Sequence, residues 1–144
     1  MWRINRLASE ILLHIDGAAK GNPGPAAIGV VAFTPDGTEL FHHSQYIGET
    51  TNNVAEYTAL IEGLKLSLQH KINTIRIASD SELIVRQIHG LYQVKTPHLK
   101  KLYNHVLQLM EKFEQIEIFH VPREKNTKAD SLANQAIKKK QNLP

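Results

Sequence analysis

Four acidic residues occupy positions where a negative charge needs a partner: Asp16, Glu56, Asp80 and Asp130. Asp16 and Asp80 each end an apolar run typical of a buried strand. Glu56 lies in the first turn of an expected helix, and Asp130 lies beside the apolar stripe of another. Carboxylates gathered at the ends of buried elements cost free energy unless a positive group binds among them. The chain has no cysteine, so the pattern favours an all-oxygen site for Mg²⁺ or Mn²⁺ over a zinc site.

Each acid also has an ordinary explanation. Asp16 precedes a glycine, a pair common in turns, and Asp80 could cap the helix that follows it. Glu56 follows Asn53 by three residues, which is the spacing of a capping box. Asp130 lies at the margin of its helix's apolar stripe, where a solvated aspartate is common. Taken together, however, the four placements favour one shared site over four unrelated roles.

The elements that must position these acids follow from hydrophobic periodicity and turn residues. Strands are expected at 10–16, 26–34, 38–47, 74–80 and 115–121, and helices at 52–70, 81–89, 96–113 and 127–140. Short connections make the first three strands antiparallel, whereas helical crossovers make the first, fourth and fifth parallel. The sequence therefore predicts a three-layer α/β fold, with a five-stranded mixed sheet and helices on both faces. Ligands in such sheets collect at the carboxyl ends of parallel strands.

Size and composition indicate one domain. The chain has 144 residues, 42% of them hydrophobic, which is enough for a single core. We expect one domain over 1–144, with 1–9 as an N-terminal extension and 141–144 as a tail. The apolar runs are too short to span a bilayer, and no secretory signal is visible. A cytoplasmic protein with no membrane contact is the expectation.

Charge is divided unevenly along the chain. Residues 1–85 contain six Lys and Arg against nine Asp and Glu, whereas residues 86–144 contain eleven against five. A polyanion that approaches a metal cluster would suit an acidic site beside a basic region. A solvated basic helix face is the alternative that charge alone leaves open.

Four stretches carry a resemblance to a known family. They are DGAAKGNPGP at 16–25, TTNNVAE at 50–56, DSEL at 80–83 and NTKADSLA at 126–133. In this order they resemble type 1 ribonuclease H over nearly the whole chain. The resemblance implies the ribonuclease H-like fold, which agrees with the order of elements expected above.

The resemblance also implies an activity and its residues. The activity is endonucleolytic hydrolysis of the RNA strand of RNA–DNA hybrids, which leaves a 5′-phosphate and a 3′-hydroxyl. It makes Asp16, Glu56, Asp80 and Asp130 the catalytic carboxylates, which hold two Mg²⁺ or Mn²⁺ ions. A two-metal site suits phosphodiester hydrolysis, because the cations neutralise charge on both the attacking and the leaving oxygen.

Further residues match hybrid-binding positions of the family. Asn22 and Thr51 resemble residues that hold a phosphate of the DNA strand, and Asn52 and Asn53 resemble residues that reach the minor groove. Short amides and hydroxyls can read the shape of a hybrid without reading its sequence. The alternative is that they are a loop asparagine and helix caps.

Two departures from the family concern the loop before Asp130 and the region between two helices. Many members have a mobile histidine in that loop. Here we expect Arg123 to take its place, as in a related subgroup of the family, in preference to His120, which belongs to a strand by its pattern. A short segment at 90–96 replaces a basic protrusion, and we expect no separate hybrid-binding domain before the fold. Lysines are expected to compensate through phosphate contacts: Lys95, Lys100, Lys101 and the C-terminal Lys138, Lys139 and Lys140.

Other functions are compatible with the same scaffold. One is a different nuclease, although the Asp-x-Glu pattern of proofreading exonucleases is absent from the first strand at 16–18. The other is a non-catalytic nucleic-acid-binding module, which would tolerate the loss of an acid that this chain retains. A monomer is the expected assembly.

Overall fold

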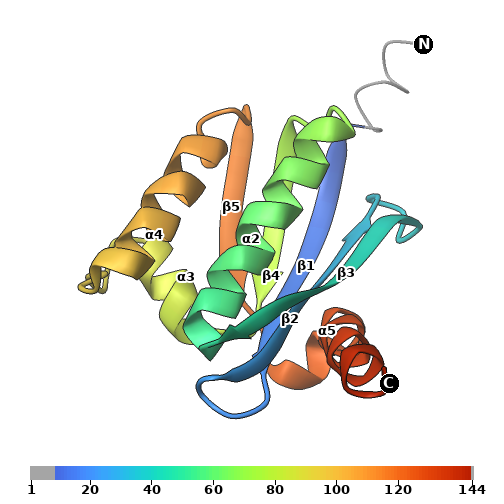
Figure 1. The fold of residues 1–144 in the computed structure, drawn as a ribbon. Coiled ribbons are helices and arrows are strands. Elements are labelled where there is room, and N and C mark those ends of the chain that lie inside the picture. The colour runs from blue at the N-terminus through green and yellow to red at the C-terminus, as the bar shows by residue number, and fades with distance from the viewer. Residues whose placement is uncertain (1–8, 144) are drawn as a thin grey trace.

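The computed structural model describes residues 9–143, which form one mixed sheet flanked by helices (Figure 1). The strands are β1 (Glu10–Ala19), β2 (Gly24–Phe33), β3 (Glu39–Thr50), β4 (Thr74–Ser79) and β5 (Gln115–His120). The helices are α2 (Asn52–Gln69), α3 (Glu82–Ile88), α4 (Pro97–Met110), α5 (Thr127–Gln141) and the short 3-10 helix η1 (Arg123–Lys125). This order agrees with the order expected from the sequence.

The sheet has the strand order β3-β2-β1-β4-β5. β1 pairs antiparallel with β2, and β2 with β3, whereas β1–β4 and β4–β5 are parallel. The parallel pairing of β1 with β4 ends at Ile15 and Ser79, so that Asp16 and Asp80 are the next residues of two neighbouring strands. The predicted α/β fold is confirmed, and the two acids come together at the carboxyl end of the parallel ladder.

Helices cover both faces of the sheet. One core contains apolar residues of β1, β2, β4, β5, α2, α3 and α4, and these three helices lie together over one face of the sheet in Figure 1. A smaller apolar cluster joins Ala27 of β2 to Ala136 and Ile137 of α5 on the other face. The sheet is therefore the middle of three layers, as expected.

Several element boundaries differ from the sequence-based expectation, and three differences concern the acids or the end of the chain. β1 continues to Ala19, so Asp16 lies inside a strand and does not begin a turn, because the small residues after it stay paired with β2. Glu56 lies beyond the first turn of α2, which contains no acidic residue. Gln141 still belongs to α5, so the expected tail begins one residue later.

The described part of the chain begins just before β1. Of the expected N-terminal extension, residues 1–8 lie outside the described residues, and β1 begins at Glu10. Within residues 9–143, none of the helices combines the length and the apolar character that a membrane span needs.

Candidate active site

The alternation of β1 sends consecutive side chains to opposite faces of the sheet. A Cβ on Gly17 would lie 2.2 Å from the backbone carbon of Ala55 in α2, so glycine permits helix and strand to touch there. On β2, a Cβ on Gly29 would lie 2.0 Å from the Ala129 carbonyl of α5. Gly29 pairs with Asp16. The two glycines therefore let α2, which carries Glu56, pack against β1, which carries Asp16. They also let α5, which carries Asp130, pack against the neighbouring strand β2.

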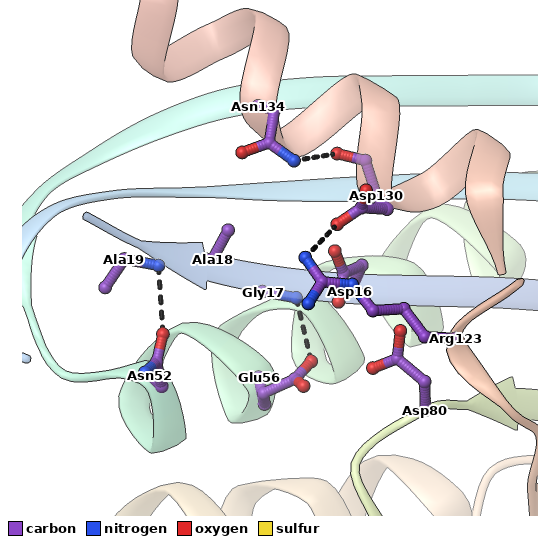
Figure 2. A pocket seen from close by; sticks show the side chains of 10 residues that line it. All are labelled: Asp16, Gly17, Ala18, Ala19, Asn52, Glu56, Asp80, Arg123, Asp130 and Asn134. Atoms are coloured by element: carbon purple, nitrogen blue, oxygen red, sulfur yellow. Dashed lines mark hydrogen bonds and ion pairs between the residues drawn. The ribbon is translucent and has the colours of Figure 1, made fainter. Parts of the chain in front are cut away.

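Three carboxylates meet at this point. Asp16, Glu56 and Asp80 each offer an oxygen, and these three atoms lie within 4.8 Å of one another. Asp16 is 4% exposed and Glu56 is 8% exposed. Figure 2 shows the cluster from β1, α2 and the end of β4, with Asp130 of α5 on its far side. All four acids line one open hollow of about 450 Å³.

Burial and mutual repulsion disfavour the charged forms. Burial raises the pKa of Asp16 to about 9, and the charges of Glu56, Asp80 and Asp130 act in the same direction. Burial also raises the pKa of Glu56 to about 8, although a hydrogen bond from the Gly17 N–H at 2.8 Å acts in the opposite direction. The pocket thus concentrates more negative charge than it can stabilise without protons or a cation.

The ordinary explanations for two of the acids do not hold. The cap of α2 is Thr51, whose hydroxyl accepts from the Val54 N–H at 3.3 Å, and Glu56 accepts from a strand and not from its own helix. The cap of α3 is Ser81, not Asp80. Both carboxylates therefore remain directed into the hollow.

The donor set fits a hard divalent cation. Every candidate ligand is a carboxylate oxygen, which suits Mg²⁺ or Mn²⁺. The raised pKa values of Asp16 and Glu56 show that a bound cation would stabilise their charged forms. Asp16, Glu56 and Asp80 form the acidic cluster that indicates a metal site. Asp130 borders it and contributes to the repulsion at Asp16.

Arg123 of η1 reaches the same hollow, whereas His120 does not line it. The Arg123 guanidinium lies 3.6 Å from an Asp130 carboxylate oxygen, and its side chain is 79% exposed. Figure 2 shows it extending across the cluster toward Asp130. His120 is the last residue of β5 and is exposed. Its assignment to a strand is confirmed.

Sequence reasoning missed two asparagines at the site. Asn134, one helical turn after Asp130, lines the hollow and donates to the Asp130 carbonyl at 2.9 Å. Asn126 is fully buried, and its amide nitrogen donates to the Ile15 carbonyl at 2.8 Å and to Asp80 at 3.4 Å. The i, i+4 spacing from Asp130 could have indicated the first. The burial of Asn126 is a tertiary property.

The four residues near α2 that are expected to bind the hybrid divide between two hollows. Asn52 lines the acidic hollow and accepts from the Ala19 N–H at 3.0 Å, as Figure 2 shows. Asn22, Thr51 and Asn53 line a second hollow of about 340 Å³ on the amino-terminal side of α2. The side-chain oxygen of Asn22 accepts from the Asn52 N–H at 3.0 Å, which ties the β1–β2 turn to the helix.

The lysines lie on exposed surface near the start of α4. Lys95 and Lys100 line a third hollow of about 440 Å³, together with Tyr92 and Tyr103. Lys101 is also exposed and lies outside that set of residues. The structure thus groups two of the three lysines beside an exposed aromatic ring, apart from the acidic hollow.

Comparison with known proteins agrees with this geometry. A family model described as reverse transcriptase-like matches residues 14–136. The chain is 43% identical to the bifunctional protein Rv2228c of Mycobacterium tuberculosis over 89% of its own length and 35% of the relative. It is 39% identical to ribonuclease HI of Halobacterium salinarum over 86% of its length and 62% of the relative. The chain therefore spans less than two thirds of these curated relatives.

Solved structures match nearly end to end. The crystal structure of RNase H1 from Halobacterium salinarum superposes with a TM-score of 0.88 at 37% identity, covering 90% of this chain and 98% of that one. LC11-RNase H1, solved in complex with an RNA/DNA hybrid, superposes with a TM-score of 0.86 at 47% identity, covering 91% and 99%. Both structures are at least 37% identical to this chain and are covered over at least 98% of their length, so the chain belongs to the ribonuclease H1 family.

Proposed function

We propose that this protein is a metal-dependent endoribonuclease that hydrolyses the RNA strand of RNA–DNA hybrids, leaving 5′-phosphate and 3′-hydroxyl ends. The observation that carries the proposal is the meeting of Asp16, Glu56 and Asp80 within 4.8 Å in an open hollow that Asp130 also lines. Family membership supports the same reaction. A similar protein, LC11-RNase H1, was solved with a bound RNA/DNA hybrid.

The four carboxylates would hold the cations. Asp16, Glu56 and Asp80 supply closely spaced oxygens, and Asp130 adds a further carboxylate from α5. Two Mg²⁺ or Mn²⁺ ions would supply Lewis-acid stabilisation of the charge that develops on the phosphate and the leaving oxygen. Because the acids lie on β1, α2, α5 and directly after β4, they would position the scissile phosphate without a large rearrangement.

Selection of a hybrid would use groups on both sides of α2. Glu56 would lie near the 2′-hydroxyl, the group that distinguishes RNA from DNA. Asn22 and Thr51 would contact a phosphate of the DNA strand, and Asn52 and Asn53 would reach the minor groove. Their placement around the amino-terminal end of α2 supports this arrangement.

A substrate panel tests the proposal. RNA–DNA hybrid, duplex DNA, duplex RNA and single-stranded RNA are incubated with the protein and Mg²⁺ or Mn²⁺, with EDTA as the control. We expect cleavage of the hybrid RNA strand alone, abolished by EDTA. Asp80→Asn should reduce the rate by at least about a thousandfold, because a metal ligand contributes several kcal/mol of transition-state stabilisation. Binding of the hybrid by Asp80→Asn should be retained.

The alternatives give different results in the same panel. A non-catalytic module would bind hybrid and cleave nothing with either metal. Another nuclease on this fold would cut duplex DNA or single strands. Full activity of Asp80→Asn would exclude the assignment of the acids. Monomeric assembly and cytoplasmic location remain predictions, and sedimentation of the purified protein checks the first.

A further inference from the structure

A partly buried chain of hydrogen bonds connects the site to His14, a residue of β1 with no role in the proposed reaction. The Nδ1 atom of His14 lies 3.1 Å from the side-chain oxygen of Asn126. The amide nitrogen of Asn126 donates to the Ile15 carbonyl at 2.8 Å and to Asp80 at 3.4 Å. Asn126 is 0% exposed, so these partners replace water completely.

Asn126 contacts the three segments that carry Asp16, Asp80 and Asp130. Its side chain contacts Ile15, the neighbour of Asp16, and the carboxylate of Asp80 itself. Its own carbonyl accepts the Asp130 N–H at 3.1 Å, in the first turn of α5. A shift of Asn126 would therefore disturb the relative positions of three of the four carboxylates.

The carboxamide can satisfy these partners in only one orientation. With its nitrogen toward Ile15 and Asp80, it offers hydrogens to a carbonyl and a carboxylate, both of which are acceptors. Rotated by half a turn, it would place an oxygen against those same acceptors, which is repulsive. The correct orientation leaves the Asn126 oxygen facing His14, where only an N–H donor satisfies it.

We propose that His14 is a positioning residue whose Nδ1–H fixes the orientation of the Asn126 carboxamide, and through it the placement of Asp80 for metal binding. His14 is half-buried, and its ring meets Phe33 edge-on with centroids 5.5 Å apart, which limits its rotation. Residues that orient a metal ligand affect metal affinity although they do not touch the metal. The catalytic part of this inference rests on the proposed function.

Two substitutions separate the hydrogen bond from packing. His14→Phe keeps a ring against Phe33 but removes the donor. His14→Asn removes the ring but keeps an N–H on an atom bonded to Cγ, where the histidine carries Nδ1. A purely structural role predicts that the phenylalanine variant is the better tolerated of the two. The proposal predicts the opposite order.

The first measurement is a Mn²⁺ titration of the metal-free proteins, in which the rise in melting temperature reports metal binding. We expect the midpoint concentration of His14→Phe to rise about tenfold, the lower end for residues that support a metal ligand. The midpoint concentration of His14→Asn should stay within about threefold of the wild-type value, because the N–H donor is kept. Equal midpoints for His14→Phe and wild type, or a weaker midpoint for His14→Asn than for His14→Phe, would overturn the proposal.

Hybrid cleavage and NMR give independent measurements. His14→Phe should lower kcat about tenfold with KM changed less than about twofold, because the substrate-binding surface is untouched. The side-chain N–H signals of Asn126 should exchange slowly with solvent in wild type and in His14→Asn, and rapid exchange in wild type would refute the proposal even if His14→Phe failed to fold. If wild type does not cleave hybrid, the proposed function fails, while metal midpoints and amide exchange still decide the role of His14.

Discussion

The acidic hollow and the surface at the start of α4 are built in opposite ways. In the hollow, Asp16 and Glu56 are 4% and 8% exposed and are held by strand and helix backbones. At the start of α4, the loop residues Leu91 and Tyr92 are 65% and 49% exposed, and Lys95 beside them is also exposed. The hollow offers fixed geometry, whereas the surface offers charge and area.

This difference predicts two kinds of response to mutation. A group in the hollow shares partners with its neighbours, so changes there should be large and non-additive. A lysine on the exposed surface acts mainly through its charge in water, so changes there should be modest, additive and dependent on salt. Substitutions in the hollow and on the exposed surface can show whether the two regions respond to mutation in these different ways.

The largest effect is expected from Gly17→Ala. The new Cβ would lie 2.2 Å from the Ala55 backbone carbon and 2.3 Å from the Glu56 nitrogen, so α2 must move away from β1. We expect a loss of at least about 4 kcal/mol of unfolding free energy, in the range of severe overpacking and backbone displacement. Urea denaturation measures it, and hybrid cleavage should be lost with it.

Gly37→Ala is the matched control in the β2–β3 turn. Gly37 has a φ of 88°, so alanine is strained there. A Cβ at Gly37 would meet no atom within 4 Å in the described part of the chain. We expect a cost of about 1–2 kcal/mol and normal activity. Equal costs at the two glycines would show that the close approach of α2 to β1 is not what the site requires.

The second prediction concerns Asp16→Asn and pH. Because the pKa of Asp16 is raised to about 9 in the folded protein, folding favours the protonated acid. Its contribution to stability is complete below the unfolded pKa near 4 and is lost as pH rises toward 9. In EDTA, wild type should therefore melt at lower temperature as pH rises over that window. Asp16→Asn should weaken this dependence and gain about 5 °C at about pH 8.5.

Added Mn²⁺ should reverse the order. The cation replaces protons in wild type, which should gain melting temperature at the same pH, whereas Asp16→Asn should gain little. Asp36→Asn, in the exposed β2–β3 turn, is the control for removal of a carboxylate outside the hollow. If Asp16→Asn were less stable than wild type in EDTA at that pH, the repulsion in the hollow would be refuted.

The same comparison explains which features the sequence predicts well. The order of elements follows from local periodicity and turn residues, and it places Asp16 and Asp80 on neighbouring strands. Glu56 and Asp130 required the tertiary approach of α2 and α5. In the sequence, only Gly17 and Gly29 indicate that the helices approach the sheet this closely. Neither glycine can be recognised as a contact point until the helix that packs against it is known.

Other features depend on tertiary contacts that a linear pattern does not contain. The extension of β1 beyond Asp16 comes from its pairing with β2, which outweighs the turn preference of Asp-Gly. The roles of Asn126 and His14 come from burial and from contacts between residues 112 and 111 positions apart in sequence. Family resemblance indicated the reaction, whereas the physical pattern alone indicated a metal site.

The third prediction addresses the exposed surface. The combined change of Lys95, Lys100 and Lys101 to alanine should raise KM for hybrid about tenfold at low salt, with little change in kcat. The dependence of log affinity on log salt should become shallower by about 0.7–0.9 for each phosphate that the variant no longer neutralises. Filter binding at several salt concentrations measures it. Stability should change little, because these side chains lie at the surface.

The matched control removes the same charge elsewhere. Lys138, Lys139 and Lys140 are exposed on the last turn of α5, so their triple alanine variant has the same net charge. If the surface at the start of α4, and not the C-terminal lysines, contacts the hybrid, this variant should keep the wild-type KM. Equal losses in both variants would mean that net charge, and not a defined surface, attracts the hybrid.

Arg123→Ala gives the smallest effect and tests the border between the two regions. The side chain is 79% exposed, as on the lysine surface, yet its guanidinium lies 3.6 Å from Asp130 in the hollow. Exposed ion pairs contribute little to stability, so the melting temperature should hold. Turnover should fall about three- to tenfold if the cation acts on a reacting or departing phosphate. Lys125→Ala, in the same 3-10 helix, is the control and should turn over normally. Loss of stability without loss of turnover would mean that Arg123 stabilises the fold and takes no part in the reaction.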